Sequence, residues 1–307
     1  MKPETEQLLR TLEVLNEHPS RIFVWDAEEQ GEFTVWNLAL AEGFVSLTDV
    51  DVALAHWQAV EHWGTPEDQT DHEYAPPRDE REDGWNAEIE AKRAELYQQL
   101  SQFLKADLQD LQAFILSVPK RNYKDFQWEH YYFCFYIIIG KTNDEKWLCF
   151  SQTVPDQVSS PHSKQQNSES LEVTDIKLLN AKTLGLPSKI HSILLELPPI
   201  TLYGYYYGGY DYTYEHQIVH ATATQKSLAI ELALQAAGML TVEKTYFEYS
   251  LNKFNRQELN QFFNSKLSER TLYSLSFWDI GYTYEIGQAP TGDWLGIQSP
   301  LEFEYNP

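Results

Sequence analysis

One short phrase is written twice in this chain, and it constrains the fold more than any other feature. The first occurrence is Ile139-Gly140 followed by Trp147-Leu148, and the second is Ile286-Gly287 followed by Trp294-Leu295. In both, the tryptophan comes seven residues after the glycine. Two apolar runs separated by a short turn are typical of a β-hairpin, so the sequence predicts the same hairpin in two places.

Two further pairs of segments occur in the same order around this phrase. Residues 95–104 correspond to residues 258–267, and residues 19–25 correspond to residues 199–205. The spacing between the markers is longer in the first copy, where residues 118–127 have the character of a surface insertion. Three markers in one order indicate a tandem duplication.

A chain of 307 residues is long enough for two domains, each with its own core. We predict a first copy at residues 1–154, a linker at residues 155–172 and a second copy at residues 173–307. The linker is rich in serine and glutamine and has no apolar period. Each copy reads as hairpin, helix, helix and hairpin, which indicates an α+β fold with helices on a mainly antiparallel sheet.

Apolar periodicity and turn signals predict the individual elements. Helical spacing occurs at residues 5–16, 49–60, 95–104, 227–239 and 255–267. Hairpins are expected from residues 22–25 with 32–40, 131–139 with 147–153, 203–214, and 273–286 with 294–303. Residues 61–92 are dense in acids and interrupted by prolines, so we expect a long charged loop there.

The formal net charge of −23 excludes some classes of partner. A field of this sign repels nucleic acid and anionic membrane surfaces and attracts basic proteins. No apolar run approaches membrane-spanning length and no leader precedes the first helix, so we expect a cytoplasmic protein. The acidity either serves solubility or imitates a phosphate backbone that occupies the basic cleft of a nucleic-acid-handling protein.

Catalytic and metal-binding patterns are weak in this sequence. Cys134 and Cys149 lie in an apolar stretch without CxxC spacing, so we predict reduced core residues. His216 and His220 are four residues apart, but the tyrosine-rich surroundings favour a strand over a zinc-binding helix. His62 and His72 lie in the acidic loop, where a solvated segment is expected. Glycine-rich phosphate loops and nucleophile elbows are missing, so we predict a non-enzyme without metal or cofactor.

The closing hairpin reads Ile286-Gly287, two residues, Pro290, one residue, Gly292, three residues, and then Gly296-Ile297 followed by a small hydroxyl. This pattern resembles the last hairpin of the nuclease A inhibitor-like family. Residues 19–26 are similar to the first strand of that family, with a proline followed by an aliphatic-Phe-aliphatic-Trp-acid run. The first copy therefore resembles the family best at its start, and the second copy resembles it best at its end.

The resemblance implies an α-β-α sandwich and the function of a small acidic protein that blocks a metal-dependent nuclease. In that family, acidic side chains, the terminal carboxylate and an aromatic wedge fill the nuclease's catalytic cleft, where a hard cation accepts oxygen ligands. This sequence departs from the pattern. The family's inhibitory acid would fall near Leu15, with Glu17 out of register, and the chain continues past the family's usual end.

Together, charge and resemblance predict a non-enzymatic protein that binds and inhibits a nuclease or another basic toxin. The expected contact residues lie in the acidic loop and in a tyrosine-rich hairpin: Trp63, Glu67, Asp68, Asp71, Glu73, Trp85, Tyr205 and Tyr207. An alternative is a structural or assembly module that uses the tyrosine-rich hairpin as its interface. A third hypothesis, an enzyme using the loop histidines, requires a bound metal.

Overall fold

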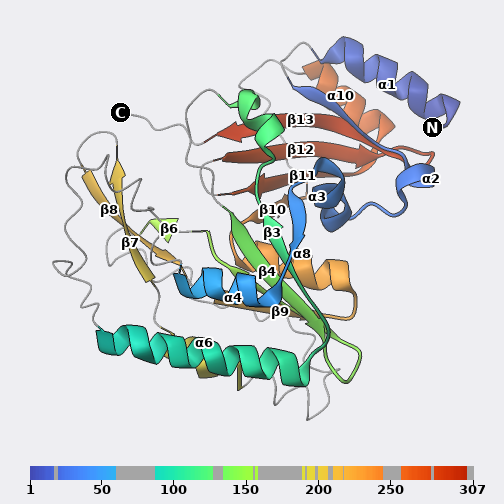
Figure 1. The fold of residues 1–307 in the computed structure, drawn as a ribbon. Helices are drawn as coiled ribbons and strands as arrows, with labels where there is room; N and C mark the ends of the chain where they lie inside the picture. Colours follow the sequence, from blue (N-terminus) through green and yellow to red (C-terminus); the bar gives the residue numbers. More distant parts are fainter. Residues whose placement is uncertain are drawn as a thin grey trace. The chain divides into compact units, whose positions relative to one another are not determined.

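The computed structural model describes residues 1–16, 20–59, 87–126, 134–154, 156–157, 189–190, 192–197, 200–206, 210–216, 218–244, 257–277 and 280–302. The chain divides into two compact units (Figure 1). Unit 1 consists of Met1–Phe44, Ser117–Phe133 and Gly238–Glu304, and unit 2 consists of Val45–Leu116 and Cys134–Ala237. Helices and antiparallel sheets occur in both units, which confirms the α+β fold class.

Unit 1 is built on one five-stranded antiparallel sheet with the strand order β1–β13–β12–β11–β10. Its strands are β1 (Arg21–Trp25), β10 (Leu240–Glu243), β11 (Ser268–Ser276), β12 (Ile280–Gln288) and β13 (Trp294–Glu302). Its helices are α1 (Pro3–Leu15), α2 (Ala27–Gln30), α3 (Val35–Glu42) and α10 (Gln257–Lys266), with the 3-10 helix η3 (Lys120–Asp125).

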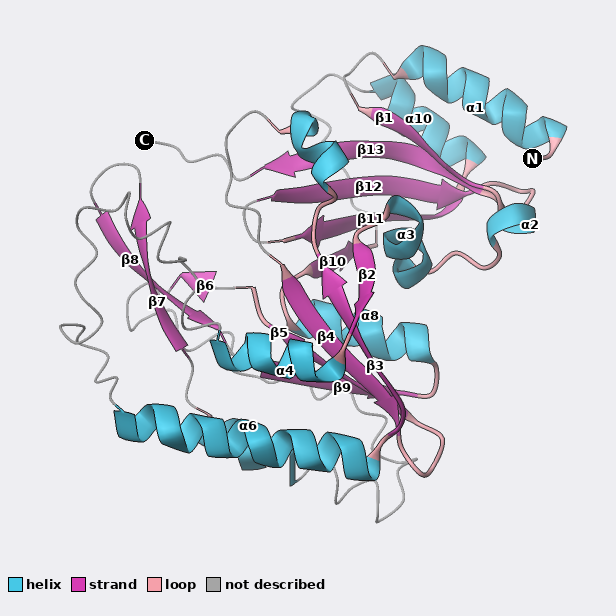
Figure 2. Cartoon of the chain, in the orientation of Figure 1, coloured by secondary structure: helices cyan, strands magenta, loops and turns pink. Residues whose placement is uncertain are grey.

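Helical segments lie on both faces of this sheet (Figure 2). On one face, the strand residues Val24 and Leu295 share a core with Leu12 of α1 and Phe263 of α10. On the other face, segment 33–44 carries α3. Phe33 before α3 contacts the rings of Trp25, Tyr273 and Trp294, and Phe44 after α3 stacks on Tyr282. Alternate strand residues point to opposite faces, so one strand supplies both layers.

Unit 2 repeats this arrangement with the strand order β2–β3–β4–β5–β9. Its strands are β2 (Val45–Thr48), β3 (Gln109–Leu116), β4 (Phe135–Lys141), β5 (Trp147–Gln152) and β9 (Ile218–Ala223). Its helices are α4 (Val50–Ala59), α6 (Ala87–Asp107) and α8 (Lys226–Ala236). A small additional sheet has the order β6–β8–β7, formed by β6 (Asp156–Gln157), β7 (Ile200–Tyr206) and β8 (Tyr210–His216).

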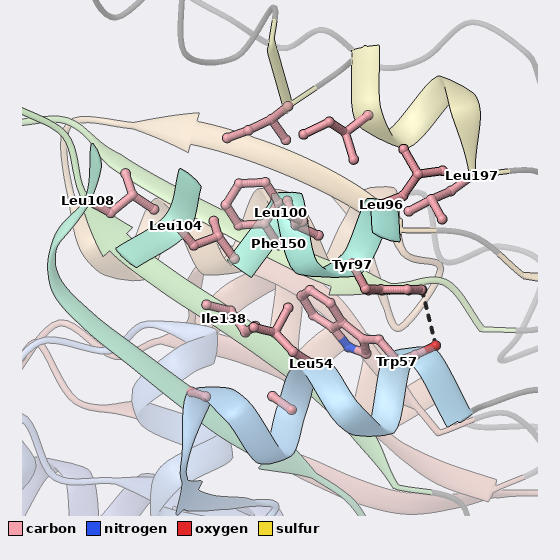
Figure 3. Close-up of a cluster of buried hydrophobic side chains, with 14 of the residues drawn as sticks. Leu54, Trp57, Leu96, Tyr97, Leu100, Leu104, Leu108, Ile138, Phe150 and Leu197 are labelled. Atoms are coloured by element: carbon pink, nitrogen blue, oxygen red, sulfur yellow. Dashed lines mark hydrogen bonds between the residues drawn. The ribbon is translucent and has the colours of Figure 1, made fainter. Parts of the chain in front are cut away.

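The main core of unit 2 lies between α4, α6 and one face of its sheet (Figure 3). Trp57 is fully buried there, and its Nε1 donates a hydrogen bond of 3.1 Å to the carbonyl of Tyr136. The Tyr97 hydroxyl donates to the Trp57 carbonyl at 3.1 Å. Both large side chains therefore satisfy their polar atoms while burying their rings, as buried aromatic residues require.

Each sheet ends in a strand that comes from the other half of the sequence. β1, from the first half, pairs with β13, and β9, from the second half, pairs with β5. The units therefore differ from the predicted boundaries at 154 and 173, because the first half contributes β1 and α3 to unit 1 and the second half contributes β9 and α8 to unit 2. We call residues 21–44 and 218–237 the exchanged segments.

The two sheets match in detail. A register shift interrupts β3–β4 between Gln109 and Gln112, and an equivalent shift interrupts β11–β12 between Ser268 and Thr271. Asp110 and Glu269, inside these shifts, have left-handed backbones with φ of 49° and 50°. A left-handed backbone is uncommon in residues other than glycine, so its recurrence at the same place in both sheets supports the duplication.

Two of the sequence markers need correction. Backbone hydrogen bonds join Leu108 to Leu104 and Leu267 to Phe263 at the ends of α6 and α10, so Leu104 corresponds to Phe263. The predicted alignment of residues 95–104 with 258–267 was wrong by one helical turn. Residues 199–205 do not correspond to residues 19–25 either, because β9 and not β7 occupies the place of β1.

Two local predictions also differ from the structure. Residues 32–40 form no strand, because the Thr34 hydroxyl caps α3 at the Asn37 amide and the segment continues as a helix to Gly43. Residues 118–127 are not a simple surface insertion: Val118, Asn122 and Phe126 are buried in unit 1. Of the two cysteines predicted to be core residues, Cys149 is buried and Cys134 is exposed, and both are free thiols.

Candidate functional site

Most of the predicted contact residues lie outside the described residues. These are Trp63, Glu67, Asp68, Asp71, Glu73, Trp85 and Tyr207, together with the loop histidines His62 and His72. Tyr205 lies in β7, opposite Asp211 of β8 in the register of the small sheet. The described part of the chain therefore brings none of the predicted contact residues together.

The histidine pair is arranged as the sequence predicts. His216 ends β8 and His220 lies in β9, so the two residues occupy strands and share no helix face. In β9, His220 is paired with Phe150 of β5, and the two rings are 6.0 Å apart. Within the described residues, no group of three histidine, cysteine or carboxylate side chains could hold a metal ion.

The two segments that carry the family resemblance meet in unit 1. β1, from the start of the chain, runs antiparallel to β13, from its end, with Phe23 opposite Gly296 and Trp25 opposite Trp294. Gly296 admits no side chain, because a Cβ atom there would lie 2.0 Å from the Glu285 carbonyl oxygen. The family-like features of both halves are thus combined in a single composite domain.

Asp293 fastens three elements together at one end of this domain. Its side chain is buried, with 1% of its surface exposed. One carboxylate oxygen accepts from the amide of Ala27 in α2 at 3.0 Å, and the other accepts from the hydroxyls of Thr5 in α1 and Thr291 in the β12–β13 turn. Because these donors occupy both oxygens, Asp293 is a structural residue that positions α1 and α2.

Asp26 fixes α2 in a similar way. Its side chain caps the helix by accepting from the amides of Glu28 and Glu29 at 3.0 and 3.4 Å. The pKa of this carboxyl is lowered, first by its hydrogen bond to the Met1 amine at 2.7 Å and then by the two amides, although burial opposes the shift. Trp25 closes the loop by donating from Nε1 to the Gly31 carbonyl at 2.9 Å.

Exposed carboxylates surround these buried acids. They lie in the first turn of α1, on α2 and in the loop that follows it: Glu4, Glu6, Glu28, Glu29 and Glu32. We call this set the acidic end of unit 1. Lys2 contacts it, with Nζ 3.5 Å from Glu28 Oε1 and 2.9 Å from the Thr291 carbonyl. The hydrogen bonds of Asp293 and Asp26 hold α1 and α2, the two helices that carry Glu4, Glu6, Glu28 and Glu29.

Other polar groups of unit 1 are buried and structural. Tyr282 donates to Asp125 at 2.8 Å, and Gln298 donates to the Tyr284 hydroxyl at 2.9 Å. Burial, and for Tyr282 also the bond to Asp125, raises the pKa of both phenols. Each phenol therefore stays protonated and serves as a hydrogen-bonding core residue.

Unit 2 contains two titratable side chains that contact aromatic rings. The His56 ring lies 4.1 Å from the Tyr136 ring, and burial lowers its pKa to about 4, so the imidazole is neutral at pH 7. Lys226 lies over Phe114 and Trp147, with Nζ 5.2 and 5.7 Å from the ring centroids. Burial lowers the pKa of this lysine, and the aromatic faces and the Gln112 side chain solvate its ammonium group.

Comparisons with protein-family models, with curated proteins and with solved structures gave no match for this chain. Among the described residues, no helix has both the length and the apolar character needed to cross a bilayer.

Sequence reasoning missed the acidic end of unit 1. Its carboxylates all precede residue 33, whereas Thr291 and Asp293, which position them, follow residue 290. The available signal was the polar Thr291-Gly292-Asp293 turn inside the family-like hairpin. The helices that this turn contacts, α1 and α2, could not be identified without knowing that β1 pairs with β13.

Proposed function

We propose that this protein is a non-enzymatic binder of basic proteins and inhibits a nuclease or another basic toxin by imitating a phosphate backbone. The observation that carries the proposal is the acidic end of unit 1, which lies in the composite domain formed by the two family-like segments. The acidic segment at residues 61–86 is a second candidate contact surface and lies outside the described residues, whereas residues 87–92, which were predicted as part of the same loop, form the first turns of α6.

Electrostatics support this proposal. Four of the five exposed carboxylates lie on helices held by buried hydrogen bonds, the fifth, Glu32, lies in the loop after α2, and within the described residues Lys2 contacts Glu28. Phosphate-binding clefts of nucleases are basic because their substrate carries a regular array of negative charges. A fixed array of carboxylates of the same sign attracts such a cleft and accelerates association, and added salt weakens the attraction.

Charge-neutral variants of equal size test the proposal. Glu-to-Gln substitution at Glu4, Glu6, Glu28, Glu29 and Glu32 removes the charge of the acidic end without changing side-chain volume. A matched control neutralises the same number of exposed acids elsewhere: Glu13, Glu95, Glu243, Glu258 and Glu269. A third variant replaces Glu67, Asp68, Asp71 and Glu73 of the acidic loop by the corresponding amides.

The assay is plasmid cleavage by a panel of basic nucleases at low and at raised salt, with binding followed by surface plasmon resonance. We expect inhibition by the parent chain and by the control variant, and its loss in the variant of the acidic end or of the loop. Inhibition that survives in both of those variants refutes phosphate mimicry. The proposal also fails if no basic protein binds the parent chain at low salt.

A second function, as an assembly module, is favoured by the separate tyrosine-rich sheet. β7 and β8 form a hairpin whose register pairs Tyr206 with Tyr210, and β6 adds a third strand at Asp156 and Gln157. Contact through this hairpin would depend on Tyr205 and its neighbours and would survive neutralisation of both acidic surfaces. Replacement of Tyr205 and Tyr207 by serine distinguishes this function, because mimicry of phosphate would be unaffected.

A further inference from the structure

We draw no further inference here: the strongest candidate, the side-chain cluster in unit 2 where the Lys226 ammonium group at the start of α8 lies over the rings of Phe114 and Trp147, is satisfied by contacts within the unit, and nothing in the described part of the chain shows which ligand would take the place of the lysine.

Discussion

At equivalent positions of the two five-stranded sheets, unit 1 has a buried ion pair and unit 2 has a buried apolar pair. In unit 1, Arg270 of β11 contacts Glu285 of β12, with 6% and 7% of their side-chain surfaces exposed. By the register of the strands, the same two places in unit 2 are taken by Leu111 and Ile138, which belong to its apolar core. We predict that the single substitution Glu285→Ile is strongly destabilising and that the double substitution Arg270→Leu with Glu285→Ile is not.

The magnitude follows from the contacts of the arginine. Arg270 donates to the side-chain oxygens of Asn264 and Asn260 at 2.8 Å each, and its guanidinium lies 5.0 Å from the Phe263 ring. Removing the carboxylate leaves a buried cation with neutral acceptors only, which costs about 3–5 kcal/mol. Replacing both partners removes that charge as well, and Asn264 can turn to water because it is exposed. We expect the double variant to be within about 1 kcal/mol of the parent chain.

Urea unfolding followed by circular dichroism measures these differences, with the single variants Glu285→Ile and Arg270→Leu completing a double-mutant cycle. Only the transition that reports on unit 1 should move if the two units unfold separately. A matched control is Glu269→Gln, which neutralises an exposed acid next to the pair and should change stability by less than about 0.5 kcal/mol. The reasoning is refuted if Glu285→Ile costs less than about 1 kcal/mol, or if the double variant is as unstable as the singles.

Three further predictions concern connectivity, pH and turn geometry. If a protease site is inserted between residues 158 and 188 and cleaved, the two halves should co-elute in gel filtration, because β1–β13 and β5–β9 join them; separation without denaturant would contradict the exchange. The pKa of His56 falls from 6.5 to about 4 on folding. The contribution of this neutral side chain to the free energy of unfolding is therefore present above pH 6.5 and is lost as the pH falls towards 4. The parent chain should lose about 1–2 kcal/mol more than His56→Gln over this window after allowance for solvent screening, and equal pH profiles would refute the assignment. Glu145 and Gly292 occupy the same position in the two hairpin turns, with φ of 66° and 94°. In thermal unfolding, Glu145→Gly should therefore stabilise the protein and Gly292→Ala should destabilise it, by about 1 kcal/mol each. Changes of equal sign would refute the equivalence of the two positions.

The sequence predicts much of the local structure and of the duplication. Helical spacing correctly places α1, α4, α8 and α10, because each buries an apolar stripe on a sheet. The repeated phrase correctly predicts two hairpins, and their turns have matching bonds, Glu145 to Thr142 and Gly292 to Ala289. Local periodicity and turn chemistry are sufficient for these features because their contacts are close in sequence.

Pairing between distant strands could not be predicted in the same way. Nothing in the residues of β1 states whether its partner is β5 or β13, since both edges belong to related sheets with the same alternation. The difference depends on a few opposed positions, such as Phe23 with Gly296 and Ala221 with Cys149, which become visible only in the paired register. The predicted strand at residues 32–40 is wrong because the Thr34 cap and the Gly43 C-cap favour a helix over the β-forming tendency of its residues.

The candidate site was predictable only in its general character. Net charge predicts an acidic binding surface, and the acidic end of unit 1 is a second candidate for such a surface beside the segment that the sequence indicates. Its position depends on Asp293 joining Thr5 and Ala27, residues that no local pattern relates. Charge can be counted from the composition, but the arrangement of the charges requires the tertiary contacts.

The strand exchange also sets an order of events during synthesis on the ribosome. Unit 2 has all its described strands once residue 223 has emerged, whereas β1 must wait for β13, at residues 294–302, before unit 1 can close. The hydrogen bond between Ala27 and Asp293 spans 266 positions. Pairing over such a distance is slow, and the apolar strand Ile22-Phe23-Val24 remains without its sheet throughout. β1 is thus made long before its partner strand and is among the last of the described strands to be paired, so its apolar residues are exposed to aggregation in that interval.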